Sequence, residues 1–158
     1  MSQGAAPKIS VGLTVDKGEK FVAEAIEAIL GQSESDLELI ITDNASTDGT
    51  EEICRGFASK DERVRYSRNP ENLGAAPNYN KSFEPARGKF FKWASHDDLC
   101  DERYLEVCLK ALEEHPDAVL AYTMSVEIDA SGQLLHEEPG GQAIDMDSAG
   151  KRLGALYD

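Results

Sequence analysis

Short apolar runs alternate with amphipathic segments along most of this chain. The strand-like runs, in which apolar residues are consecutive or alternate, are residues 8–14, 37–42, 64–66 and 89–94. The segments with apolar residues every three or four positions, typical of helices with one buried face, are residues 19–30, 50–57, 77–84 and 104–112. Strands that alternate with helices at this spacing predict βαβ units and a largely parallel sheet.

Two further elements are expected toward the C-terminus. Residues 118–123 predict a fifth strand, and residues 125–129 and 133–136 predict a hairpin around the turn Ala130-Ser131-Gly132. From Glu137 onward the sequence no longer shows a strand-like or helix-like pattern of apolar residues. The predicted fold class is therefore α/β, with a mostly parallel sheet flanked by helices and a C-terminal hairpin.

Charge narrows the range of ligands. The 158 residues suffice for one domain with a substantial core, and 30 acidic against 16 basic residues give a net charge of −14. Because the summed field repels phosphates, this charge disfavours nonspecific binding to nucleic acid or to an anionic membrane. No apolar stretch approaches the length of a membrane span, and the N-terminus lacks the pattern of a signal peptide.

The cysteines favour a reducing compartment. Cys54, Cys100 and Cys108 are odd in number, lie in or beside helical patterns and form no Cys-x-x-Cys pair, which argues against a zinc site. Reduced thiols predict a cytoplasmic protein, with peripheral attachment to a membrane left open.

The candidate chemistry lies at predicted strand ends. Ser95-His96-Asp97-Asp98 directly follows a buried strand, and two adjacent carboxylates there suggest a hard divalent cation that shares its coordination with substrate phosphates. The alternative is that Asp97 or Asp98 caps the helix that starts near Asp101. A second acidic strand end, at Asp43, favours the metal. In parallel sheets ligands bind at the carboxyl ends of strands, so one ligand could contact Thr14, Asp43 and the acidic pair.

The order of these motifs resembles the family 2 glycosyltransferases, which have the Rossmann-like GT-A fold. The matching residues are Ile9 to Leu13, Phe21 to Gln32, Leu37 to Thr50, Asn72-Leu73-Gly74 and Gly88 to Leu99. The similarity covers residues 7–129. The stretch from Asp43 to Thr50, combined with a downstream acidic pair, is far more specific than either part alone.

The resemblance implies a role for each candidate residue. Thr14 would line the base and ribose pocket, and Asp43 would accept a hydrogen bond from the base or the ribose. Asp98 would bind Mn²⁺ or Mg²⁺ directly, in the place of the family's DxD-type motif. Asp97 would contact the ribose, the sugar or a metal-bound water, and His96 would act as a neutral donor or pack nearby.

The chain also departs from the family pattern. Asp16-Lys17 replaces a frequent aromatic–Asn pair after the first strand, which removes a stacking partner for the base. Tyr79-Asn80 replaces a frequent Arg-Asn pair, and tyrosine cannot offset phosphate charge as arginine does. We expect a backbone role for Gly74 and a loop-holding role for Asn72.

The predicted organisation has three parts. Residues 1–7 form a disordered leader, residues 8–136 a GT-A nucleotide-sugar-binding domain, and residues 137–158 a loop and the incomplete start of the acceptor-side region. No catalytic base is assigned, because Glu137 and Glu138 precede the position expected from the family. A sheet without that region would expose apolar surface, which predicts self-association.

Three functions are weighed. The first is a metal-dependent, inverting transfer of a sugar from a nucleotide-sugar donor to an acceptor hydroxyl, with the acceptor itself (glycan, lipid or protein) left open. The second is a non-catalytic nucleotide-sugar-binding or interaction module derived from such an enzyme. A nicotinamide-dependent oxidoreductase is disfavoured, because no Gly-x-Gly-x-x-Gly follows the first strand.

Overall fold

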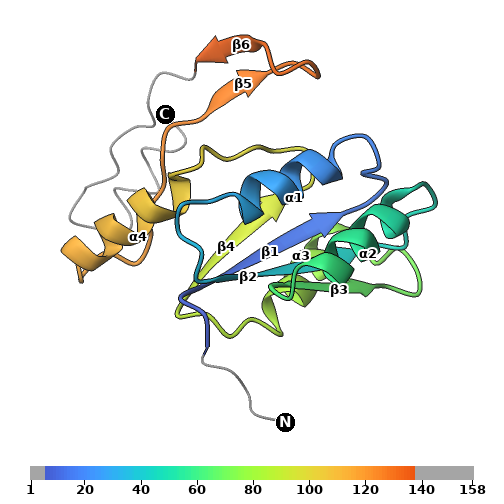
Figure 1. The fold of residues 1–158 in the computed structure, drawn as a ribbon, viewed down its shortest axis with the longest axis horizontal. Helices are drawn as coiled ribbons and strands as arrows, with labels where there is room; N and C mark the ends of the chain where they lie inside the picture. Colours follow the sequence, from blue (N-terminus) through green and yellow to red (C-terminus); the bar gives the residue numbers. More distant parts are fainter. Residues whose placement is uncertain (1–5, 138–158) are drawn as a thin grey trace.

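The computed structural model describes residues 6–137 and shows alternating strands and helices (Figure 1). The elements are β1 (Ile9–Val15), α1 (Val22–Leu30), β2 (Leu37–Asp43), α2 (Thr50–Lys60), β3 (Val64–Arg68), α3 (Ala75–Phe83), β4 (Phe90–Ser95), α4 (Tyr104–Glu114), β5 (Val126–Ile128) and β6 (Leu134–Glu137). The alternation predicted from hydrophobic periodicity is confirmed as far as α4.

The first four strands form one parallel sheet in the order β3-β2-β1-β4. In this register Thr14 lies beside both Thr42 and Ser95, and Val15 lies beside Asp43. The carboxyl ends of β1, β2 and β4 therefore meet at one edge of the sheet. This is the edge at which ligands bind in open parallel sheets.

Helices cover both faces of the sheet. Helices α1 and α2 lie side by side on one face, and α3 lies on the other, against β1 and β2 (Figure 1). On the α3 face, a Cβ at Gly12 would come 2.6 Å from Ser82 Oγ and 2.7 Å from the Phe91 ring. Glycine at this position of the central strand thus permits the close packing of α3.

The core lies between the sheet and the α1–α2 layer. Its fully buried members include Leu13, Leu39 and Ile41 of the strands, Ile26 of α1 and Cys54 of α2. All seven residues of β1 and of β2 are buried, as expected for inner strands of a sheet covered on both faces.

The C-terminal part of the described chain differs in part from the prediction. The hairpin is confirmed, because β5 and β6 pair antiparallel. The strand predicted for residues 118–123 is wrong, since this segment follows α4 as irregular chain. Val119 is 99% exposed and Leu120 is 69% exposed. The run has the composition of a strand, but it pairs with no strand among residues 6–137.

Some expectations concern parts that the structure does not describe or test. Most of the predicted leader and nearly all of residues 137–158 lie outside the described residues, and self-association stays a prediction. No described helix is both long enough and apolar enough to cross a membrane.

Candidate functional site

A cavity of about 380 Å³ lies at the carboxyl ends of β1 and β4, where the strand register predicted a site. We name it the strand-end cavity. Its lining residues are Thr14, Val15, Asp16, Asn44, Asn72, Gly74, Ala75, Asn78, Tyr79, Ser95 and His96. Thr14 and His96 line this one cavity, whereas Asp43, Asp97 and Asp98, which the strand ends also predicted to meet one ligand, do not line it.

Buried asparagines shape the wall of this cavity. The Asn44 side chain, 3% exposed, donates to Asn72 Oδ1 (2.8 Å). Its own Oδ1 accepts from the Leu73 backbone N–H (2.9 Å) and from Asn69 Nδ2 (3.1 Å). Asn72 in turn donates to Asp16 Oδ2 (2.8 Å) and thereby joins the loop after β3 to the loop after β1. The loop-holding role expected of Asn72 is confirmed.

The backbone at Gly74 explains why a glycine directly precedes α3. Gly74 has φ +83°, in the left-handed region, and its N–H donates to Asn72 Oδ1 (2.8 Å). The backbone role expected of Gly74 is confirmed. Helix α3 begins at Ala75, two residues before Pro77, so the proline lies in its first turn.

Asp43 lies beneath the site and does not line the cavity. Its side chain is fully buried. Oδ1 accepts from the Ser46 N–H (2.8 Å), Oδ2 accepts from the Tyr66 hydroxyl (2.7 Å), and Arg68 Nε lies 3.5 Å from Oδ2. Burial and this hydrogen bond raise the pKa of Tyr66. The carboxylate therefore fastens the turn after β2 to β3.

The acidic pair directly follows Ser95 and His96, the last residues at the end of β4 that line the cavity, and neither carboxylate lines it. Ser95 Oγ donates to Asp97 Oδ1, and this hydrogen bond holds the pKa of Asp97 below its usual value. His96 Nδ1 lies 4.0 Å from the same oxygen. The Asp97 side chain is 54% exposed, and Asp98 is also exposed. The alternative capping role is not seen, since Arg103 precedes α4 and no side chain caps its N-terminus.

These carboxylates fit a hard divalent cation that takes its remaining ligands from water and substrate. Two adjacent, accessible carboxylates supply the oxygen donors that Mg²⁺ and Mn²⁺ prefer. Among residues 6–137, no group of three His, Cys, Asp or Glu side chains could hold a metal without other ligands. A cation at this position would therefore need ligands from water or from a bound substrate besides the two carboxylates.

Two residues without the freedom of glycine adopt left-handed backbone conformations beside the cavity. Lys17 has φ +56° and Ala45 has φ +62°. The Lys17 N–H donates to Ser46 Oγ (2.9 Å), which ties the loop after β1 to the turn after β2. Both turns thus store backbone strain next to the candidate site.

Replacing Ala45 with glycine is expected to raise the free energy of unfolding by about 0.5–1 kcal/mol, because glycine adopts positive φ without a Cβ penalty. Urea denaturation measures the change. Ala28→Gly, inside α1, is the matched control and is expected to lower stability by about 1 kcal/mol. A loss of stability in both variants would contradict the strain at Ala45.

The fold and the site together define a class of protein. The structure is similar to that of TarS of Staphylococcus aureus, solved in complex with UDP-GlcNAc (TM-score 0.64, 24% identity, 69% of this chain and 32% of that one). It is also similar to the mannosyltransferase PcManGT of Pyrobaculum calidifontis, solved with GDP-Man and Mn²⁺ (TM-score 0.64, 21% identity, 80% of this chain and 37% of that one). The architecture is that of the GT-A glycosyltransferases.

The sequence places the chain more narrowly. The model of glycosyl transferase family 2 matches residues 10–152, and the chain belongs to this family. A protein of Methanocaldococcus jannaschii named as an uncharacterized glycosyltransferase is 34% identical over 83% of the chain. GlyG, a glycosyltransferase of Streptococcus pneumoniae serotype 4, is 32% identical over 67% of it. The matched regions are 46% and 35% of these two relatives, so the chain spans less than half of their length.

Proposed function

We propose that this chain forms the donor half of a metal-dependent, inverting glycosyltransferase, which binds a nucleotide-sugar and presents its sugar to an acceptor hydroxyl. The observation that carries the proposal is the strand-end cavity, lined by Ser95 and His96, with the exposed pair Asp97-Asp98 in the next two positions of the same loop. Membership of family 2 and the nucleotide-sugars in the complexes of TarS and PcManGT support it.

The proposal gives each residue a role. Thr14 lines the pocket for the base and ribose, and His96 donates to the ribose or packs beside it. Asp98 binds Mn²⁺ or Mg²⁺, and Asp97 orients the ribose, the sugar or a metal-bound water. When bound, the cation neutralises charge on the leaving nucleoside diphosphate. For Asp43 Oδ2 to contact the nucleoside, the Tyr66 hydroxyl must first release its hydrogen bond to that oxygen.

Calorimetric titration with UDP, GDP, dTDP and CDP, each with and without Mn²⁺, tests the donor site. One nucleotide is expected to bind in a metal-dependent manner. Asp98→Ala is expected to weaken that binding at least about tenfold, because a metal–carboxylate contact is lost. Asp117→Ala, an exposed aspartate after α4, is the control and is expected to bind as wild type does. Equal binding by the Asp98 variant would refute the metal assignment.

A non-catalytic nucleotide-sugar-binding or interaction module is the second candidate. Tyr79 lines the cavity with its ring 6.4 Å from that of Trp93, so no cation takes the position at which arginine is frequent. The same titrations separate a module that binds nucleotide-sugars from a module that only contacts another protein. If no nucleotide binds, only the second kind of module remains.

A further inference from the structure

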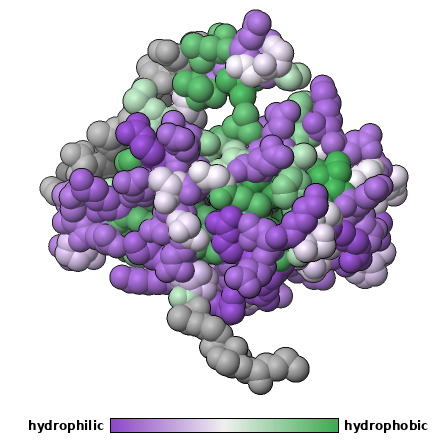
Figure 2. Space-filling model, in the orientation of Figure 1, coloured by the Kyte–Doolittle hydropathy of each residue, from purple (hydrophilic) through white to green (hydrophobic). Residues whose placement is uncertain are grey.

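A second cavity, of about 440 Å³, lies between the hairpin and the start of α1. We name it the hairpin cavity. It is lined by Phe21 and Glu24 at the start of α1, by Asp97 and Leu99 of the loop after β4, and by residues 128–132 of the hairpin. The hairpin of β5 and β6 lies over α1 in Figure 1, and apolar residues gather on it and on the body beneath it in Figure 2.

The two cavities meet at the loop that carries the acidic pair. Ser95 and His96 line the strand-end cavity, whereas the next residue, Asp97, lines the hairpin cavity. In a group transfer the attacking atom must come within about 3–3.5 Å of the reacting carbon. The hairpin cavity adjoins the strand-end cavity at this loop. It is therefore placed to hold the second substrate.

The lining of the hairpin cavity selects a neutral ligand. Glu24 and Asp97 supply carboxylate oxygens, and none of the residues that line the cavity is Lys, Arg or His. Asp129 adds a third carboxylate, whose Oδ1 already accepts the Ser131 N–H (2.8 Å) and the Gln133 N–H (3.0 Å). Anionic ligands would meet the negative charge of three carboxylates here, with the amine of Lys20 beside Phe21 as the nearby cation.

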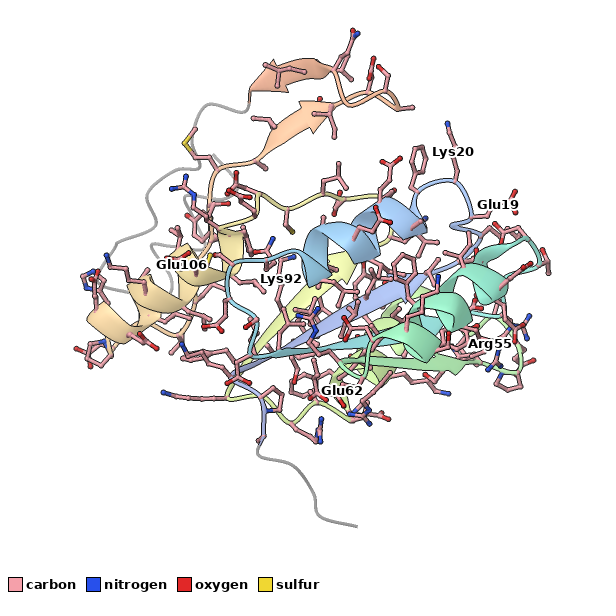
Figure 3. All side chains as sticks on the ribbon, viewed as in Figure 1. Glu19, Lys20, Arg55, Glu62, Lys92 and Glu106 are labelled. Atoms are coloured by element: carbon pink, nitrogen blue, oxygen red, sulfur yellow. The ribbon has the colours of Figure 1, made fainter. Side chains whose placement is uncertain are left out.

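The remaining lining suits the carbon face of a sugar ring. Phe21 contributes an aromatic surface, and Leu99 and Ile128 are 49% and 39% exposed. Lys20, labelled in Figure 3, places its amine 4.6 Å from the centre of the Phe21 ring, so its charge lies over the ring. An apolar platform flanked by carboxylate acceptors binds molecules that combine C–H faces with hydroxyl donors.

We propose that the hairpin cavity binds the acceptor and that this acceptor is a neutral saccharide. Phe21 packs against a pyranose face, and Glu24 and Asp97 accept hydrogen bonds from its hydroxyls. The assignment of an acceptor rests on the proposed glycosyltransferase function. The binding of a neutral saccharide at this cavity does not, because it needs neither nucleotide nor metal.

Amide NMR titration of the full chain with methyl glycosides, without nucleotide or metal, tests the site. Methyl glucoside, galactoside and N-acetylglucosaminide are added to about 100 mM, a range that detects weak binding. At least one glycoside is expected to give saturable shifts at residues 21–24 and 128–132. Methyl glucuronide is expected to bind at least about fivefold more weakly, because its carboxylate faces Glu24 and Asp97.

Two substitutions distinguish glycoside binding in the hairpin cavity from nonspecific effects of the added glycoside. Phe21→Ala is expected to weaken glycoside binding about fivefold, whereas Phe83→Ala, which removes a 52% exposed ring on α3, leaves it unchanged. Absence of saturable shifts, or equal binding by the Phe21 variant, would overturn the proposal. Saccharide binding in a chain that binds no nucleotide would refute the donor function while the saccharide site stands.

Discussion

Replacing Glu38 with alanine is expected to lower the free energy of unfolding by about 3 kcal/mol, because it removes a buried acceptor on which several donors converge. Glu38 is 2% exposed. Its Oε1 accepts from Ser10 Oγ (2.7 Å) and the Arg87 N–H (2.8 Å), and its Oε2 accepts from Arg87 Nη2 (2.8 Å) and Arg65 Nη1 (3.1 Å). The side chains of Arg65 and Arg87 are 43% and 50% exposed, so in the variant water hydrates them and offsets part of the lost stability. Urea denaturation at neutral pH measures the change in the free energy of unfolding.

Acid titration distinguishes the charge of Glu38 from its packing. Burial alone would raise the pKa of Glu38, but hydrogen bonds from Arg87, Ser10 and Arg65 together lower it below the usual 4.5. A carboxyl with a lowered folded-state pKa stabilises the fold above its unfolded-state pKa, and this contribution is lost as pH falls through the folded-state pKa. The stability difference between wild type and Glu38→Gln is therefore expected to shrink as pH falls below 4.5. A constant difference would mean that packing alone accounts for the effect.

Gly88→Ala is expected to destabilise the protein by about 2 kcal/mol through overpacking. A Cβ at Gly88 would lie 2.5 Å from Ser10 N and 2.7 Å from Ile9 C, both backbone atoms of β1. Since backbone cannot rotate away, the start of the β1–β4 pairing must move, and the Gly88 N–H would lose its hydrogen bond to Ser10 Oγ (2.8 Å). Thermal and urea denaturation measure the loss.

Gly56→Ala is the matched control for Gly88. Gly56 lies inside α2, and a Cβ there would meet nothing within 4 Å. The substitution is expected to stabilise the protein by about 1 kcal/mol, through helix propensity alone. Equal changes in stability at the two glycines would contradict overpacking against β1 as the cause of the loss at Gly88.

The positions of the strands and of the cavity could be predicted because they depend on local pattern. Runs such as Leu39-Ile40-Ile41 predict buried strands, and parallel order then brings Thr14 and Ser95 to one edge. Residues 118–123 show the limit of this reasoning. Their composition suits a strand, but a strand also needs a partner, and composition does not specify one.

The finer structure of the site depends on contacts that no periodicity encodes. The carboxamide of Asn44 joins the turn after β2 to the loop after β3, through hydrogen bonds with Asn69, Asn72 and the Leu73 N–H. Asp43 is at the predicted strand end, but its carboxylate accepts a hydrogen bond from the hydroxyl of Tyr66, a residue 23 positions away. The hairpin cavity depends on where the hairpin folds back over α1, which turn residues alone do not determine. Short polar side chains after several strands were the available signal for the asparagine network.

The separation of Glu38 from the strand-end cavity has a consequence for sequence divergence. Ser10 pairs with Glu38 near the amino ends of β1 and β2, whereas Thr14 and Asp43 lie at the carboxyl ends of the same strands. The ion pairs of Glu38 and the proposed donor site thus lie at opposite ends of one sheet. Under the proposed function, exchange of loops at the carboxyl ends between relatives changes the preferred nucleotide or sugar and leaves those ion pairs in place. Chimeras that graft the 44–49 and 69–74 loops together, and so keep the hydrogen bonds of Asn44 with Asn69 and Asn72, would be expected to keep the stability of the recipient.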